Sequence, residues 1–135
     1  MNYQMLVLDL DGTLTNSKKE ITAPTRQALI EIQEAGKKVV LASGRPINGV
    51  VFLAEELELS RFGSYILSFN GGRITQCSTN QIIYNKVLPP EVIAPIYEEV
   101  KAIPSLDIVS YDDTYLISGL NTNEYTEEEA PSLIH

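Results

Sequence analysis

The chain has 135 residues, of which 44% are hydrophobic and 21% are charged, and its net charge at pH 7 is −8. This length and apolar content suit one globular domain, or one domain and part of another, and exclude a disordered chain. No apolar run approaches the roughly 20 residues that span a bilayer. The start of the chain lacks a signal-peptide pattern, and the single cysteine, Cys77, cannot form an internal disulfide. We therefore expect a cytoplasmic protein without a membrane segment.

The acidic net charge argues against a nucleic-acid partner, because proteins that bind phosphate backbones carry basic patches. The charge is unevenly distributed along the chain. Residues 1–45 contain six Lys and Arg against five acidic residues, whereas residues 46–135 contain four against thirteen. The first third of the chain is therefore the part most compatible with an anionic ligand.

Short apolar runs alternate with amphipathic segments in the first half of the chain. Two continuous apolar runs, at residues 5–8 and 39–42, predict buried strands, and residues 65–69 predict a third strand. Between them, residues 22–35 and 50–57 carry apolar side chains at helical spacing, with Thr22 as a candidate N-cap. Alternating strands and helices predict an α/β fold, in which a parallel sheet has helices on both faces.

The pattern changes after Gly72. Short antiparallel strands are expected at 73–75 and 82–84, followed by a helix from residue 90 to about 102 that Pro95 should kink or delay. A hairpin around Asp112-Asp113 is expected next, and the polar segment from Gly119, with Glu127–Glu129, is expected to fray. We place a domain boundary near residue 80, with an incomplete α/β core at 1–80 and an α+β segment at 81–135.

Polar groups follow the carboxyl ends of all three predicted parallel strands. They are Asp9, Asp11 and Thr13 after the first, Ser43-Gly44-Arg45 after the second, and Asn70-Gly71 after the third. Ligands of open parallel sheets bind beyond such strand ends. Carboxylates, a hydroxyl, an arginine and the backbone N–H groups beside glycines suit a phosphate group together with Mg²⁺.

The two aspartates of the first strand end are separated by a single residue. If the backbone stays extended past Leu10, the carboxylates of Asp9 and Asp11 lie on the same side of the strand. One carboxylate can then attack a phosphorus atom while the other exchanges a proton with the same substrate oxygen. Phosphoryl transfer through an aspartyl-phosphate needs this division of roles.

These residues also resemble the motifs of a known family. Asp9-Leu10-Asp11-Gly12-Thr13-Leu14 resembles the first motif of the haloacid dehalogenase superfamily, and Ser43-Gly44-Arg45-Pro46 resembles its second. Together with Lys18-Lys19 and Phe69-Asn70-Gly71-Gly72, they are similar to the Cof-type subfamily, phosphatases of sugar phosphates and small metabolites. The resemblance covers residues 3–72 closely and residues 73–118 loosely.

The resemblance implies a role for each motif residue. Asp9 would be the nucleophile and a Mg²⁺ ligand, and Asp11 would be the general acid and base and also a metal ligand. The phosphate and the substrate would be bound by residues of the three loops, namely Gly12, Thr13, Ser43, Gly44, Arg45, Asn70 and Gly71. The substrate would be a small phosphorylated metabolite, and the segment after residue 80 would begin a cap domain.

Two parts of the family pattern have no match in this chain. The pattern continues with a phosphate-binding lysine and an acidic pair that completes the metal site. Lys86 and Lys101 lie in the cap-like segment, and Asp112-Asp113 has the signature of a tight turn rather than of a metal ligand pair. We therefore expect the N-terminal portion of the fold, with weak activity and with an exposed edge of the first strand that favours self-association.

Other interpretations of the same residues stay open. The chain is alternatively a catalytically dead binding or structural protein. A phosphoacceptor receiver domain is a third candidate, but its acceptor aspartate would stand where this chain has Asn70. Asn70-Gly71 is equally typical of a simple hairpin turn.

Overall fold

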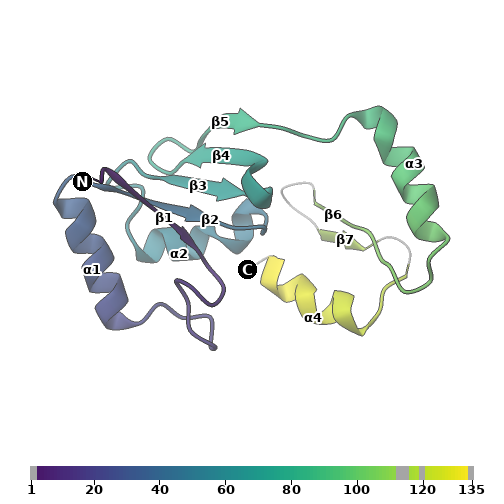
Figure 1. The fold of residues 1–135 in the computed structure, drawn as a ribbon, viewed down its shortest axis with the longest axis horizontal. Helices are drawn as coiled ribbons and strands as arrows, with labels where there is room; N and C mark the ends of the chain where they lie inside the picture. The colour runs from purple at the N-terminus through teal and green to yellow at the C-terminus, as the bar shows by residue number, and fades with distance from the viewer. Residues whose placement is uncertain (1–2, 112–115, 119–120, 134–135) are drawn as a thin grey trace. The chain divides into compact units, whose positions relative to one another are not determined.

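The computed structural model describes the backbone of residues 3–111, 116–118 and 121–133. The chain divides into two compact units, Met1–Asn85 and Lys86–His135. The first unit extends to Asn85 because β5 (Gln81–Asn85) pairs with β4 (Arg73–Gln76) (Figure 1). A boundary near residue 80 would separate these two strands. The assignment of the units as catalytic core and cap stays a prediction.

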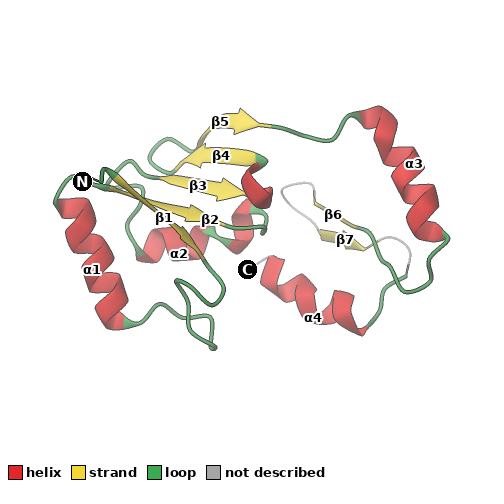
Figure 2. Ribbon diagram, viewed as in Figure 1, coloured by secondary structure: helices red, strands yellow, loops and turns green. Residues whose placement is uncertain are grey.

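The first unit is a five-stranded mixed sheet with the order β1-β2-β3-β4-β5 (Figure 2). Its elements before β4 are β1 (Met5–Asp9), α1 (Ala23–Glu34), β2 (Lys38–Ala42), the 3-10 turn η1 (Ile47–Gly49), α2 (Val51–Glu56), β3 (Tyr65–Ser68) and the 3-10 turn η2 (Phe69–Gly71). The first three strands are parallel, and β4 and β5 are antiparallel to their neighbours. The predicted α/β fold and the order of its elements are confirmed.

Both helices of this unit pack on the same face of the sheet, which corrects the expectation of helices on both faces. Leu29 of α1 and Leu53 of α2 belong to a single buried cluster. The sheet residues in that cluster, Val39, Leu41 and Ile66, all lie on one face, because side chains alternate along a strand. Crossovers that run in the same direction across a sheet, with the usual right hand, place their helices on one side.

Strand β1 is exposed rather than buried on both faces, which contradicts the sequence-based expectation. Met5 and Val7 are each 51% exposed, and Leu6 is 37% exposed. The central strand β2 has the expected burial, with Val39, Val40 and Leu41 almost fully covered. The difference arises because, among the described strands, β1 lies at one end of the sheet and pairs with β2 alone.

The second unit contains α3 (Pro90–Lys101), the antiparallel pair β6 (Val109–Tyr111) and β7 (Leu116–Ser118), and α4 (Glu124–Leu133). Helix α3 begins at Pro90 and runs through Pro95, so the internal proline does not delay its start. The hairpin is confirmed by its strands, whereas Asp112-Asp113 lies outside the described residues. Within the described parts of the chain, no helix is both long and apolar enough to cross a membrane.

Helix α4 corrects the prediction that the chain frays after residue 119. The Asn123 side chain accepts hydrogen bonds from the N–H groups of Tyr125 at 3.0 Å and Thr126 at 3.2 Å, which caps the helix. The Thr126 hydroxyl and the Asn121 N–H both donate to the carboxylate of Asp107. A cap and a tertiary anchor therefore hold a segment whose composition is mainly polar.

Candidate active site

The carboxyl ends of β1, β2 and β3 meet at one edge of the sheet, because the three strands are parallel and in register. Asp9 lies beside Ala42, and Ala42 lies beside Leu67. A pocket of about 270 Å³ opens at these strand ends. Its lining consists of Asp9, Ala42, Ser43, Leu67, Asn70 and Gly71. The structure thus brings the predicted nucleophile together with residues from the second and third predicted loops.

The loops after β2 and β3 are tied to each other by their backbones. The Asn70 N–H donates to the Ser43 carbonyl at 3.0 Å, and the Phe69 N–H donates to the Arg45 carbonyl at 3.0 Å. Gly44 lies against the Asn70 side chain, and a Cβ atom at position 44 would stand 3.1 Å from Oδ1 of Asn70. A glycine at position 44 therefore leaves room for the Asn70 amide beside the pocket.

Asn70-Gly71 forms the turn that leads from β3 into β4. Both residues have positive φ, 54° and 83°, a conformation that asparagine and glycine tolerate better than other residues. The turn interpretation is therefore confirmed. Asn70 and Gly71 also line the pocket, so the turn places them where a substrate role requires them. That substrate role stays a prediction.

The Asp9 carboxylate is the open acidic group of this pocket. Within the described residues it takes part in no hydrogen bond or ion pair, and its side chain is exposed. Ser43 is buried, and its hydroxyl oxygen accepts a hydrogen bond from the Arg45 N–H at 3.2 Å. The hydroxyl proton of Ser43 remains available to an incoming oxyanion, which suits its predicted role in phosphate binding.

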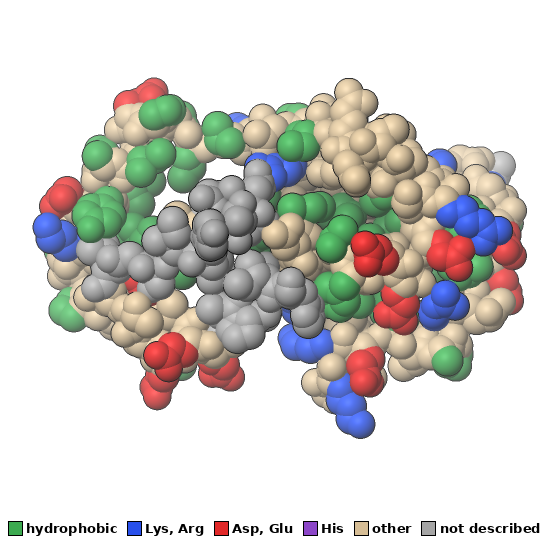
Figure 3. Space-filling view, turned by 180° about the vertical axis from the view of Figure 1, so that it is seen from behind, with side chains coloured by type: hydrophobic (Ala, Val, Ile, Leu, Met, Phe, Trp, Pro, Cys, Tyr) green, Lys and Arg blue, Asp and Glu red, His purple; other side chains and the backbone are tan. Residues whose placement is uncertain are grey.

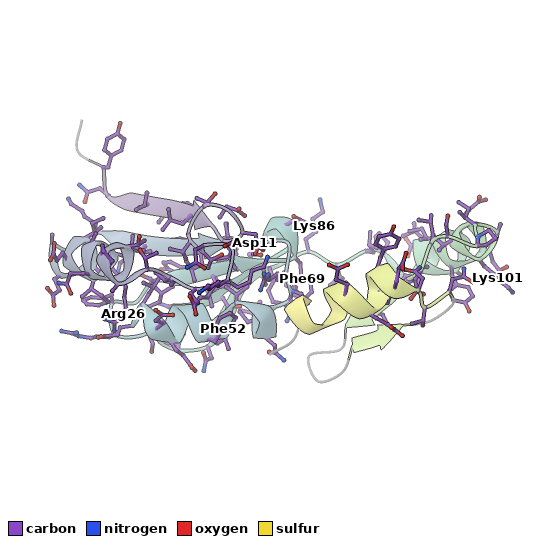
Figure 4. All side chains as sticks on the ribbon, turned by 90° about the horizontal axis from the view of Figure 1, so that it is seen from below. Asp11, Arg26, Phe52, Phe69, Lys86 and Lys101 are labelled. Atoms are coloured by element: carbon purple, nitrogen blue, oxygen red, sulfur yellow. The ribbon has the colours of Figure 1, made fainter. Side chains whose placement is uncertain are left out.

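The carboxylate of Asp11 is held by two cations. Nζ of Lys19 lies 2.6 Å from Oδ1, and Nη2 of Arg45 lies 2.8 Å from Oδ1 and 3.0 Å from Oδ2. The hydrogen bond from Lys19, followed by that from Arg45, lowers the pKa of Asp11 against the opposing effect of partial burial. Asp11 lies at the end of the sheet, beyond β1 (Figure 4).

The Arg45 side chain contacts other groups of the chain, and its predicted substrate role stays a prediction. Its side chain is 10% exposed, and Nη1 donates to the Gly49 carbonyl at 3.4 Å while Nη2 contacts Asp11. Lys19 is a site residue to which the sequence had assigned no role. It follows Asp11 by eight residues in an irregular loop, where no helical or strand spacing indicates a contact.

Gly12 and Thr13 lie in the loop that follows β1. The Leu10 carbonyl accepts from the Leu14 N–H at 3.0 Å and from the Thr15 hydroxyl at 3.0 Å, which folds the loop back on the strand. Gly12 has a φ of 74°, as a tight turn at this position requires. Both residues are exposed, and their predicted contact with phosphate stays a prediction.

The donor atoms at this site fit the chemistry of Mg²⁺ but form only part of a site. The ion prefers hard oxygen ligands, and the open carboxylate of Asp9 is one. The Asp11 carboxylate is engaged by Lys19 and Arg45 instead. Among the residues that the structure describes, no group of three or more acidic, histidine or cysteine side chains converges on one point.

Charges on the helix-bearing part of the first unit are balanced locally. Glu58 pairs with Arg61 at 2.8 Å and with Arg26 at 3.6 Å. In Figure 3, side chains of both signs are interspersed over the face of this unit that is turned to the viewer. The face seen there is therefore not a stripe of one sign of the kind that tracks a phosphate backbone.

Residues 6–133 match the model of the haloacid dehalogenase-like hydrolases. The chain belongs to this family. The match extends over both units, and it confirms the resemblance to the family and to its Cof-type subclass that the motifs at Asp9 and Ser43 carry. The predicted partial fold of this family is confirmed as well.

Individual relatives support the same assignment. A crystal structure of a haloacid dehalogenase-like hydrolase from Bacteroides thetaiotaomicron is similar over 97% of this chain and 49% of its own, with a TM-score of 0.85 and 46% identity. YxeH of Bacillus subtilis is 34% identical over 96 residues, which is 71% of this chain and 36% of that protein. The 5-amino-6-(5-phospho-D-ribitylamino)uracil phosphatase YcsE of the same organism is 30% identical over 73% of this chain and 38% of its own.

The chain therefore spans about half the length of the solved relative and little more than a third of these two curated relatives. The matched part includes β1, which ends at Asp9, and β2, which Ser43 follows.

Proposed function

We propose that this chain carries the nucleophile-bearing part of a phosphatase that acts on small phosphorylated metabolites of the sugar-phosphate kind. The observation that supports this most is the open carboxylate of Asp9 in a pocket that it shares with Ser43 and Asn70. The family is one of hydrolases, and the relative YcsE is named for its action on a phosphorylated metabolite.

In the proposed reaction, an oxygen of Asp9 attacks the phosphorus atom and forms an aspartyl-phosphate as the bond to the leaving oxygen breaks. The Ser43 hydroxyl donates to a phosphate oxygen, and backbone N–H groups near Gly44 support it. Asp11 gives a proton to the leaving oxygen and later takes one from the water that releases phosphate. Asp9 would hold Mg²⁺, which supplies charge neutralisation when bound.

The contacts of Asp11 constrain its proposed role. A carboxylate held by Lys19 and Arg45 with a lowered pKa is a proton acceptor, not a donor. Asp11 must leave at least one of these cations before it can protonate a leaving group. In the proposed cycle, the arrangement seen here corresponds to the ionised state of Asp11.

We further propose that the 135-residue chain by itself turns substrate over weakly. The described residues offer Asp9 as the one uncommitted carboxylate at the pocket, and a Mg²⁺ site with so few protein ligands is poorly held. The exposed edge of β1 also favours self-association of the isolated chain, because unpaired strand edges attract other strands.

The test is phosphate release from a panel of sugar phosphates in the presence of Mg²⁺. The variants are Asp9→Asn, which removes the nucleophile and keeps its shape, and Cys77→Ser as a control away from the strand ends. We expect slow release by the parent chain and by the control, and none above background by Asp9→Asn. Equal release by Asp9→Asn and the parent would overturn the proposal, and so would no release by the parent at any Mg²⁺ concentration.

A further inference from the structure

A second pocket of the first unit shares no lining residue with the pocket at Asp9. Its volume is about 580 Å³, and its lining comes from η1, α2, β3, β4 and the turns that follow α2 and β4. Sites for small molecules in proteins have volumes of roughly 300–1,000 Å³. This pocket is therefore large enough to hold a small molecule, and no residue proposed for phosphoryl transfer lines it.

The floor of this pocket is formed by side chains of two neighbouring strands. Ile66 of β3 lies opposite Thr75 of β4, so the two side chains point to the same face of the sheet. Ile66 belongs to the buried cluster that α1 and α2 cover, which identifies this face as the helix-bearing one. Cys77, two residues after Thr75, packs against the same cluster and also lines the pocket. The floor thus combines an apolar surface with a hydroxyl and a thiol.

Helix α2 forms a wall of the pocket because three of its residues share one helical face. Val51, Ala54 and Glu55 stand at positions i, i+3 and i+4, which are neighbours on a helix surface, and all three line the pocket. Ala54 is buried, whereas Val51 is 40% exposed and Glu55 is exposed. The wall is therefore apolar at depth and acidic at the mouth.

The lining includes polar groups that no other described residue engages. Thr75 is only 8% exposed, yet its hydroxyl takes part in no hydrogen bond, although buried polar groups normally have a partner. The Glu55 carboxylate forms neither a hydrogen bond nor an ion pair with the described part of the chain. Glu58 and Arg61, which also line the pocket, pair with each other at 2.8 Å. The charge of Glu55 is thus left without a partner.

We propose that this pocket binds a small molecule with an apolar body and one ammonium group, of the arylalkyl amine class. The apolar body would contact Ile66 and Ala54, and the ammonium group would pair with Glu55 at the mouth. An anion of the same size is disfavoured, because its charge would meet Glu55 while Arg61 is already paired with Glu58. The site is distinct from the pocket at Asp9, so the proposal does not rest on the proposed phosphatase activity.

The experiment titrates the 135-residue chain with three compounds of similar size, namely phenethylamine, phenethyl alcohol and hydrocinnamate. Dissociation constants at pH 7 are measured from amide shifts in NMR spectra, without phosphate or Mg²⁺. We expect the amine to bind at least about tenfold more tightly than the carboxylate, with the alcohol between them. The shifts should concentrate at Val51, Thr75 and Cys77, and the bound amine should slow the alkylation of Cys77 by iodoacetamide.

Two variants of α2 separate the proposed contact from a general effect of charge. Glu55→Gln removes the carboxylate at the pocket and should reduce the preference for the amine over hydrocinnamate to less than about threefold. The matched control is Glu56→Gln, which makes the same change at the next residue, outside the lining, and should retain the preference. The NMR spectrum of each free variant checks that it is folded.

Several results would overturn the proposal. They are no binding of the amine, shifts confined to residues outside the pocket, equal affinity for the amine and the carboxylate, and the same loss of preference in Glu55→Gln and Glu56→Gln. Because binding is measured without catalysis, its failure is distinct from failure of the proposed phosphatase activity.

Discussion

Nζ of Lys19 and Nη2 of Arg45 lie 2.6 Å and 2.8 Å from the same oxygen, Oδ1 of Asp11. The two cations come from different loops, one after β1 and one after β2. The side chain of Arg45 is nearly buried, whereas that of Lys19 is 59% exposed. Asp11 therefore has one fixed partner and one that solvent can replace.

Replacing Lys19 should raise the pKa of Asp11. Lys19→Met keeps most of the aliphatic side chain and removes the hydrogen bond that contributes most to the lowered pKa. Carbon NMR titration of the Asp11 carboxyl group should show a pKa nearer to the ordinary value of 3.8. The matched control is the neighbouring exposed residue, in the variant Lys18→Met. An unchanged pKa in Lys19→Met would show that the contact does not persist in solution.

The same shift links the stability of the fold to pH. Because the pKa of Asp11 is lowered in the folded state, its contribution is fully present above 3.8 and is lost as the pH falls through the lowered pKa. Asp11→Asn should therefore reduce the melting temperature at pH 7, and the difference from the parent should disappear at the lowest pH at which both remain folded. A difference that is constant with pH would contradict the ionic contacts of Asp11.

Removal of the Arg45 guanidinium should destabilise the first unit. Arg45→Met loses the contacts to Asp11 and to the Gly49 carbonyl, and we expect a cost of about 2 kcal/mol in the free energy of unfolding, measured in urea. Arg61→Met is the comparison, since Arg61 pairs with Glu58 at the surface and should leave the urea midpoint unchanged. Equal effects of both variants would show that the burial of Arg45 adds nothing.

A methyl group at position 44 should disturb the Asn70 side chain. In Gly44→Ala, the new Cβ would stand 3.1 Å from Oδ1 of Asn70, and we expect a cost of about 1 kcal/mol. In the Asn70→Ala background the same change should cost less, because the amide is absent. A double-mutant cycle on urea unfolding measures this coupling. Additive costs would mean that the two residues do not touch.

The single thiol should react slowly in the folded chain. Burial raises the pKa of Cys77 to about 11, from an ordinary value of 9.0. At pH 8 we expect alkylation by iodoacetamide roughly a hundredfold slower than that of an unstructured peptide thiol, since the thiolate is the reactive form. The rate should recover in denaturant. Fast alkylation under native conditions would contradict the burial of Cys77.

Local sequence patterns were sufficient for the order of the elements and for the residues at the strand ends. The patterns at residues 39–42 and 65–69 predicted the strands β2 and β3. Thr22, the predicted N-cap, caps α1 by accepting a hydrogen bond from the Thr25 N–H. The motif at Asp9 and the motif at Ser43 are each a run of consecutive residues, so each can be identified from the local sequence alone. Their convergence followed from one further fact, that parallel strands end at the same edge of a sheet.

The sequence alone determined the family, the order of the elements along the chain and the place of Asp9 at the end of a strand. Only the tertiary structure decided that Arg45 and Lys19 hold Asp11, that both helices cover one face, and that the apolar side chains of β1 are exposed. The physical reason is the sequence separation of the residues that interact. Helical and strand patterns arise from residues that are close together along the chain. An ion pair between two loops, or the burial of an apolar strand, depends on what lies beside it in space. The 135 residues thus place Asp9 at the end of a strand, while the pocket that it shares with Ser43 and Asn70 forms only when the parallel strands lie side by side.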